Sequence, residues 1–191
     1  MAKGRLEAFS DGVLAIIITI MVLELRPPHE ATLEALQPLW PTFSSYILSF
    51  VYLAIYWNNH HHLMQATRVV SGRVLWANVH LLFWLSLFPF ATAWVGETTF
   101  ASVPMAIYAT VFLAAALAYA ILVRALVAVP GQNLALAEAV GRDRKGIGSV
   151  IANGLAIPLA LVQPLLAVAV IVGVAAVWFV PDRRMERALG H

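Results

Sequence analysis

Residues 5–24 read RLEAFSDGVLAIIITIMVLE: a charged and polar start is followed by twelve uncharged residues from Gly12 to Leu23. An uncharged run of about 10–14 residues is more typical of a buried or interfacial helix than of a membrane span. We therefore expect a helix over residues 5–25 that is the weakest membrane segment of the chain. Because an ionised aspartate inside a span costs about 2.5–3.5 kcal/mol on insertion scales, Asp11 is expected to face protein.

The composition around this stretch is that of a membrane protein. The 191 residues are 61% hydrophobic and 12% charged, whereas soluble domains average about 45–50% apolar and 25% charged. The net charge of +2 does not indicate a nucleic-acid partner, because the basic residues lie in short loops and not on one soluble face. The absence of cysteine excludes disulfides, thiolate metal sites and cysteine nucleophiles. We expect the N-terminal segment to be retained, since no signal-peptide pattern precedes a soluble domain.

The charge-free intervals predict an all-α fold with six transmembrane helices. Each of the middle intervals exceeds the roughly 20 residues that cross the hydrocarbon core. The last interval is too long for one span, and Gln163-Pro164 is expected to divide it because proline breaks helices. The predicted helices cover about 5–25, 38–62, 73–95, 103–127, 147–162 and 165–180, with a short loop helix at about 133–140. Residues 1–191 are thus expected to form a single domain.

The distribution of lysine and arginine predicts the orientation of these spans. With six spans and both termini cytoplasmic, only Arg26 lies outside, as the positive-inside rule expects. Polar residues of segments 5–11, 57–62 and 73–80 then meet at the cytoplasmic side. These segments contain the expected hydrogen-bond donors to Asp11, which are Arg5, His60, His80, Asn78 and Trp76.

Two interpretations of the first helix remain open on pattern alone. At about 100° per residue, Ile16, Thr19 and Leu23 share a face with Gly12, and Ile20 lies at its edge. The helix is either buried on all sides or the lining of a pore. If several copies met on an axis, rings of the three apolar side chains would form a constriction that gates by dewetting.

Three motifs in the first half of the chain resemble one known family. Arg5-x-x-x-Phe9-Ser10-Asp11 looks like the R-x-x-x-F-S-D signature of the transmembrane protein 175 family, which comprises endosomal and lysosomal potassium channels and their bacterial relatives. Tyr56-Trp57-Asn58-Asn59-His60 is similar to a second family motif. Leu75-Trp76-Ala77-Asn78, followed by Pro89-Phe90-Ala91-Thr92, is similar to a third.

This resemblance implies a specific architecture and function. Bacterial members are six-helix subunits that assemble as homotetramers around a pore lined by the first helix, without a T-V-G-Y-G filter. By position, Ile16 would form the tightest ring, Ile20 and Leu23 further rings, and Thr19 a hydroxyl layer linked to potassium preference. Ala15 departs from relatives that place serine beside the constriction. A supporting polar network would comprise Arg5, Phe9, Ser10, Asp11, Trp57, His60, Trp76 and Asn78.

The resemblance therefore predicts a potassium-preferring cation channel and not an enzyme, with potassium as the permeant ion and no cofactor, in a bacterial cell membrane. A small secondary transporter is the main alternative, because Pro89, Pro158 and Pro164 could break helices around a midplane site. A haem-binding protein with His60 and His80 as ligands is a more distant alternative. The three histidines 60–62 are not expected to bind one metal ion, because they point about 100° apart on a helix.

Overall fold

The computed structural model describes residues 3–130 and 144–179, and within these ranges every regular element is helical. The elements are α1 (Lys3–Leu23), the 3-10 helix η1 (Glu34–Leu39), α2 (Trp40–Ala66), α3 (Gly72–Ser86), α4 (Phe88–Glu97), α5 (Ser102–Val127), α7 (Arg144–Val162) and α8 (Pro164–Phe179). The loop helix predicted at 133–140 lies outside the described residues.

Five segments of the described chain are long and apolar enough to cross a membrane, and α8 is a shorter apolar helix. The expectation that the first helix is the weakest of them was wrong. Its mean hydropathy reaches 2.1, second only to the 2.3 of α5 among the five candidate spans. The helix begins at Lys3, so the apolar residues Leu6, Ala8 and Phe9 add to its hydropathy. The prediction had counted only the uncharged residues after Asp11.

The span predicted at 73–95 is two helices, α3 and α4, joined at Leu87. Pro89 lies in the first turn of α4, where a backbone N–H has no partner within the helix, so its absence is least destabilising there. Because proline has no N–H to donate, Pro89 cannot extend the hydrogen-bond pattern of α3. The predicted division at Gln163-Pro164 lies where α7 ends and α8 begins. Pro158, by contrast, lies inside α7 without ending it.

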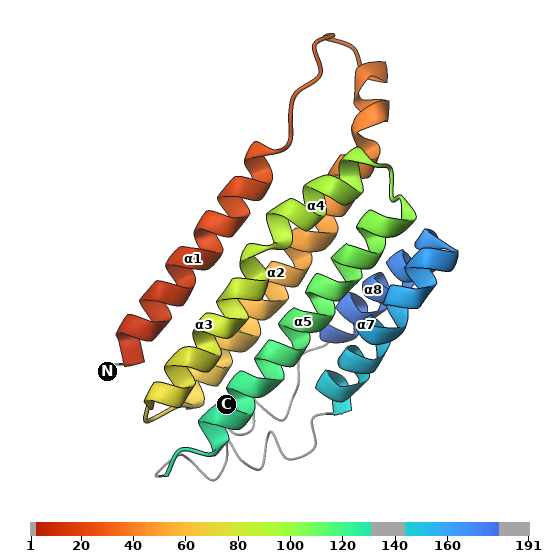
Figure 1. Cartoon of the computed structure of the whole chain (residues 1–191). Coiled ribbons are helices and arrows are strands. Elements are labelled where there is room, and N and C mark those ends of the chain that lie inside the picture. Colours follow the sequence, from red (N-terminus) through yellow and green to blue (C-terminus); the bar gives the residue numbers. More distant parts are fainter. Residues whose placement is uncertain (1–2, 131–143, 180–191) are drawn as a thin grey trace.

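The helices form a bundle with α1 at one edge and α7 and α8 at the other (Figure 1). α1 contacts α2, α3 and α4, whereas α5 packs against α3 and α7 in the middle of the bundle. The start of α1, the turn between α2 and α3 and the end of α5 lie at one end of the bundle (Figure 1). The basic residues of the first half of the chain, apart from Arg26, therefore gather at that end.

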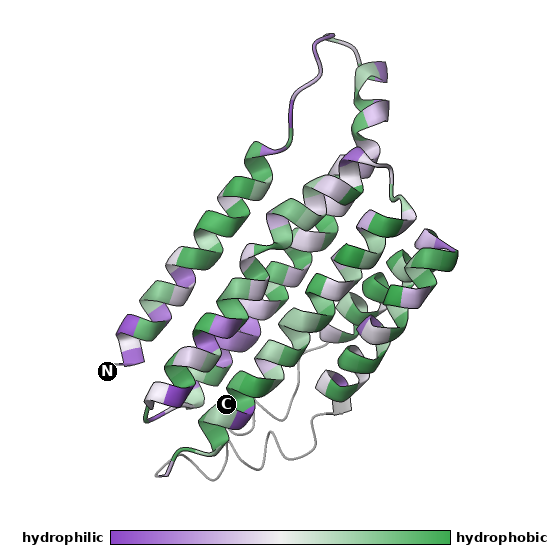
Figure 2. Cartoon of the chain, in the orientation of Figure 1, coloured by the Kyte–Doolittle hydropathy of each residue, from purple (hydrophilic) through white to green (hydrophobic). Residues whose placement is uncertain are grey.

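Close packing fixes α4 against α2 and α5. A Cβ atom on Gly96 would lie 2.8 Å from the Cα atom of Thr42, so only glycine allows α4 this near to α2. Phe88 stacks on Phe112 of α5 with ring centroids 4.6 Å apart. Within the helices beside α1, hydrophilic residues gather at the start of α1 and on the neighbouring parts of α2 and α3, and the loop after α1 is also hydrophilic (Figure 2). The polar site is thus at the α1 edge of a tightly packed bundle.

Candidate functional site on helix α1

The two faces of α1 have different surroundings. Leu6, Leu14, Ile17 and Met21 are each 3% exposed and pack against the rest of the bundle together with Ser10, which is fully buried. The opposite face carries all four predicted pore residues: Ile16 is 60% exposed, Ile20 43% and Leu23 73%, and Thr19 is also exposed. A single subunit therefore does not bury α1 on all sides, as one of the two interpretations required.

The Thr19 hydroxyl is oriented by its own helix. It donates a hydrogen bond to the carbonyl oxygen of Ala15 at 2.8 Å, as threonine commonly does one turn back along a helix. Because its proton is used in this bond, the hydroxyl presents oxygen lone pairs on the exposed face of α1. The arrangement suits an acceptor for cations and not a donor for anions.

A buried chain of hydrogen bonds, the inner network, joins α1 to α3 and α2. Asn78 Nδ2 donates to Ser10 Oγ at 2.9 Å, and Ser10 Oγ donates to the carbonyl oxygen of Leu6, also at 2.9 Å. On its other side Asn78 Oδ1 accepts from His60 Nε2 at 2.8 Å. Ser10 and Asn78 are fully buried and His60 is 4% exposed, so each polar group is satisfied away from solvent. These three members of the predicted network lie together.

An exposed set of contacts, the outer network, lies beside the inner one. Trp57 Nε1 donates to Asp11 Oδ1 at 3.0 Å, so the donor to Asp11 is none of the five that the sequence suggested. The Trp57 ring stacks on the His61 ring with centroids 5.8 Å apart, and His61 contacts Gln65 at 2.9 Å. Trp57 reaches Asp11 because Trp57 and His61, which are one turn apart, lie on the part of α2 that runs beside the exposed side of α1.

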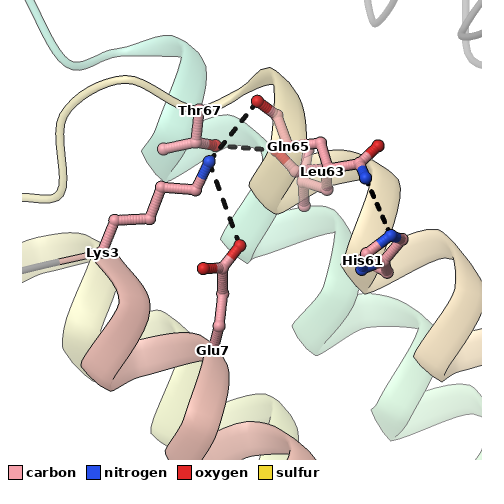
Figure 3. A network of polar contacts seen from close by, with 6 residues as sticks. All are labelled: Lys3, Glu7, His61, Leu63, Gln65 and Thr67. Carbon is pink, nitrogen blue, oxygen red and sulfur yellow. Dashed lines mark hydrogen bonds and ion pairs between the residues drawn. The ribbon is translucent and has the colours of Figure 1, made fainter.

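The outer network ends where α1 begins. Lys3 Nζ lies 3.9 Å from Glu7 Oε1 and donates to the backbone oxygen of Gln65 at 3.5 Å, as Figure 3 shows. In the same view Thr67 closes the end of α2 by donating to the carbonyl oxygen of Leu63 at 2.8 Å. The start of α1 is therefore held to the end of α2 on its exposed side as well as through the buried chain.

Three predicted members of the network are not brought into it within one subunit. Arg5 and Phe9 lie on the exposed side of α1, and Trp76 is 77% exposed on α3. Among the described residues, none of these three side chains forms a hydrogen bond or ion pair. These three side chains are exposed on the surface of the single subunit.

The histidines do not form a metal or haem site in the described part of the chain. His60 bonds to Asn78 and His61 contacts Gln65, while His80 Nε2 accepts from Trp84 Nε1 at 3.0 Å. His60 and His80 are therefore committed to different partners and not to a shared ion. No group of three or more metal-ligating side chains converges among the described residues.

Sequence reasoning missed one carboxylate near the far end of α1, that of Glu97 in α4. Glu24 and Glu97 line the same groove as Ile20, together with Phe90 and Trp94 of α4. They also line a second groove at the start of α2. The sequence did single out Glu97, because it is the only charged residue between Arg73 and Arg124.

Comparison with known proteins gives consistent matches. Residues 5–89 match the family model described as endosomal/lysosomal potassium channel TMEM175. A protein named as a potassium channel in a Chryseobacterium species is 50% identical over 189 residues, which cover 99% of this chain and 98% of the relative. Chicken (Gallus gallus) TMEM175, named as an endosomal/lysosomal proton channel, is 34% identical over 37% of this chain and 17% of its own length.

The fold matches a solved structure as well. The crystal structure of a lysosomal potassium-selective channel TMEM175 homolog from Chamaesiphon minutus superposes with a TM-score of 0.78 at 27% identity. The superposition covers 93% of this chain and 96% of that one. The matched proteins are ion channels embedded in membranes and not enzymes.

Proposed function

The chain belongs to the TMEM175 family of channels, and we propose that it forms a potassium-preferring cation pore lined by the exposed face of α1 in a homotetramer. The observation that carries this proposal is the placement of Ile16, Thr19, Ile20 and Leu23 on the face of α1 that its own subunit leaves uncovered. A lipid-facing helix would not gain from the Thr19 hydroxyl on that face.

Copies of α1 around an axis would close a hydrophobic constriction. Rings of Ile16, Ile20 and Leu23 exclude water when narrow, so the pore gates without a backbone-carbonyl filter. The lone pairs of Thr19 supply the polar layer between these rings. Glu24 and Glu97 at the far mouth would raise the local concentration of cations over anions.

The polar networks position this lining helix. The inner network of Ser10, Asn78 and His60 fixes the rotation of α1 about its axis, because a rotation by one residue breaks the bond from Asn78. We assign Arg5, Phe9 and Trp76 to contacts between subunits, since all three are exposed in one copy. The single domain of residues 1–191 lies in the bacterial cell membrane with both termini cytoplasmic, as the basic residues at one end of the bundle favour.

A bilayer recording tests the pore. Purified protein should pass current whose reversal potential follows the potassium gradient when sodium and pH gradients are opposed to it. A reversal potential that follows the pH gradient would show a proton channel, the function in the name of the chicken relative. Obligatory coupling of potassium to a second ion would show the transporter.

The constriction has its own test. Ile16→Asn should wet the narrowest ring and raise the potassium conductance by about tenfold or more, equivalent to at least 1.4 kcal/mol of barrier. Ile20→Asn is the matched control one turn away and should raise it less. If only Ile20→Asn raises the conductance, the constriction lies at Ile20.

Assembly and orientation are tested on the same preparation. Native mass spectrometry should give four subunits per particle. Because the chain lacks cysteine, single cysteines at Lys3 and Glu30 can be labelled from opposite sides of sealed vesicles. Labelling of position 3 from the outside of intact cells would reverse the proposed topology.

A further inference from the structure

A cavity lies between α2, α5, α7 and α8, on the far side of the bundle from α1. It has a volume of about 50 Å³ available to small molecules, and its walls come from all four helices. The two alanines of α5 that line it, Ala116 and Ala120, are one turn apart and leave the space open. None of its lining residues belongs to the pore surface or to Asp11 and its partners.

Four of the twelve residues that line the cavity are aromatic. Tyr52 and Tyr56 of α2, Tyr119 of α5 and Trp178 of α8 line it, and Tyr56 and Tyr119 meet edge to face with centroids 6.0 Å apart. Aromatic walls with a few polar groups are the usual lining of sites for small organic ligands. Within the described part of the chain, the residues that line the cavity carry no charged side chain. An ion is therefore a poor occupant.

Most polar groups of the wall already have partners. Tyr52 donates to the carbonyl oxygen of Ile171 at 2.8 Å, and Trp178 Nε1 donates to Ser149 Oγ at 2.8 Å. Asn153 and Tyr56 are the exceptions. Asn153 is 1% exposed, and its Oδ1 is a buried acceptor without a hydrogen-bond partner among the described residues, where the Tyr56 hydroxyl also forms no hydrogen bond. An unpaired buried acceptor is destabilising and is normally satisfied by a donor from water or a ligand.

The occupant of the cavity can be inferred from four properties: its volume, its aromatic side chains, the lack of charge among its described lining residues and the unpaired acceptor of Asn153. A buried water needs about 10–15 Å³ of such volume, so the cavity holds a few waters or one small ring. Water would leave the aromatic walls in poor contact. We propose that this cavity binds a neutral single-ring molecule with one hydrogen-bond donor, whose ring packs against the tyrosines and whose donor satisfies Asn153. This site is separate from the conducting surface.

A matched pair of probes tests the proposal. Phenol and toluene have nearly the same shape, but only phenol carries a donor. The purified full-length protein should bind phenol about tenfold more tightly than toluene, measured by competition against a ring-fluorinated phenol observed by ¹⁹F NMR. Asn153→Leu should abolish this preference while toluene still binds. The control Asn58→Leu, an exposed position outside the cavity, should leave the preference intact.

A filling variant locates the site. Ala120→Phe should prevent saturable binding of both probes. Unchanged phenol affinity in Asn153→Leu, or binding that survives Ala120→Phe, would overturn the proposal. If either variant does not fold, crystals of the natural protein soaked in 4-bromophenol decide: an anomalous bromine peak between α2 and α7 supports the site. Ordered waters there without a peak contradict it.

Discussion

Ile16 and Ile17 are neighbours with the same side chain, yet Ile16 is 60% exposed and Ile17 is 3% exposed. The contrast extends along all of α1. One face packs on α2, α3 and α4, whereas the described residues leave most of the other face exposed, apart from contacts such as that of Asp11 with Trp57. Both faces are rich in isoleucine and leucine, so hydrophobicity does not distinguish them. The difference is that one face stabilises the subunit, while the other is the face for which we propose assembly and conduction.

The largest effect on stability is expected when Ile17 is replaced by asparagine and compared with the same replacement at Ile16. Ile17→Asn removes buried packing and places an unpaired amide against the bundle, which should cost about 3 kcal/mol. Ile16→Asn should change the free energy of unfolding by less than about 0.5 kcal/mol. Unfolding in detergent followed by circular dichroism measures both. Equal losses would show that the two faces are not distinct.

The next largest effect concerns the inner network. Asn78→Leu removes both hydrogen bonds of Asn78 and leaves Ser10 and His60 buried without it, which should cost about 2 kcal/mol. The same assay measures this loss. As a control, Asn58→Leu changes an exposed asparagine of α2 and should be nearly neutral. A neutral Asn78→Leu would mean that water replaces the lost bonds.

A smaller effect is expected in the outer network. Trp57→Phe removes the donor to Asp11 but keeps an aromatic ring, and the exposed carboxylate can then be solvated. A double-mutant cycle with Asp11→Ala should give a coupling energy of about 1 kcal/mol. A coupling as large as the loss in Asn78→Leu would place both networks in one cooperative unit.

The smallest effect is expected at the far end of the exposed face. Glu97→Gln should lower the potassium conductance about twofold in dilute salt, because one carboxylate per subunit no longer attracts cations. The effect should fade near 1 M salt, where the Debye length is about 3 Å. An unchanged conductance at every salt concentration would show that the groove lies apart from the ion path.

Much of the fold follows from the sequence, because the position of each helix depends mainly on residues within that helix. Long charge-free intervals must be helical in a membrane, and Gln163-Pro164 must interrupt a run too long for one span. The break between α3 and α4 was harder to foresee. Pro89 can be accommodated in the first turn of a new helix or by a kink. The structure has the new helix, in which the neighbouring Phe88 packs on Phe112.

The sequence predicted which residues of α1 share a face, but not how the polar side chains pair. The exposed positions of Ile16, Thr19 and Leu23 follow from helical periodicity, once the opposite face is known to pack on the bundle. That Trp57 would bond Asp11 depends on how α1 is rotated against α2, which no local pattern fixes. Asn153 and Glu97 were overlooked for the same reason, since their neighbours come from distant helices.

The exposed Asp11 has a consequence for how the protein is made. A newly inserted subunit that remains alone presents this carboxylate, which among the described residues is paired with Trp57 alone, to its surroundings. In lipid that exposure costs energy, and in the proposed homotetramer neighbouring copies would cover it. Excess subunits would then be the less stable species in the cell, and degradation of unassembled copies would adjust their number to that of complete channels.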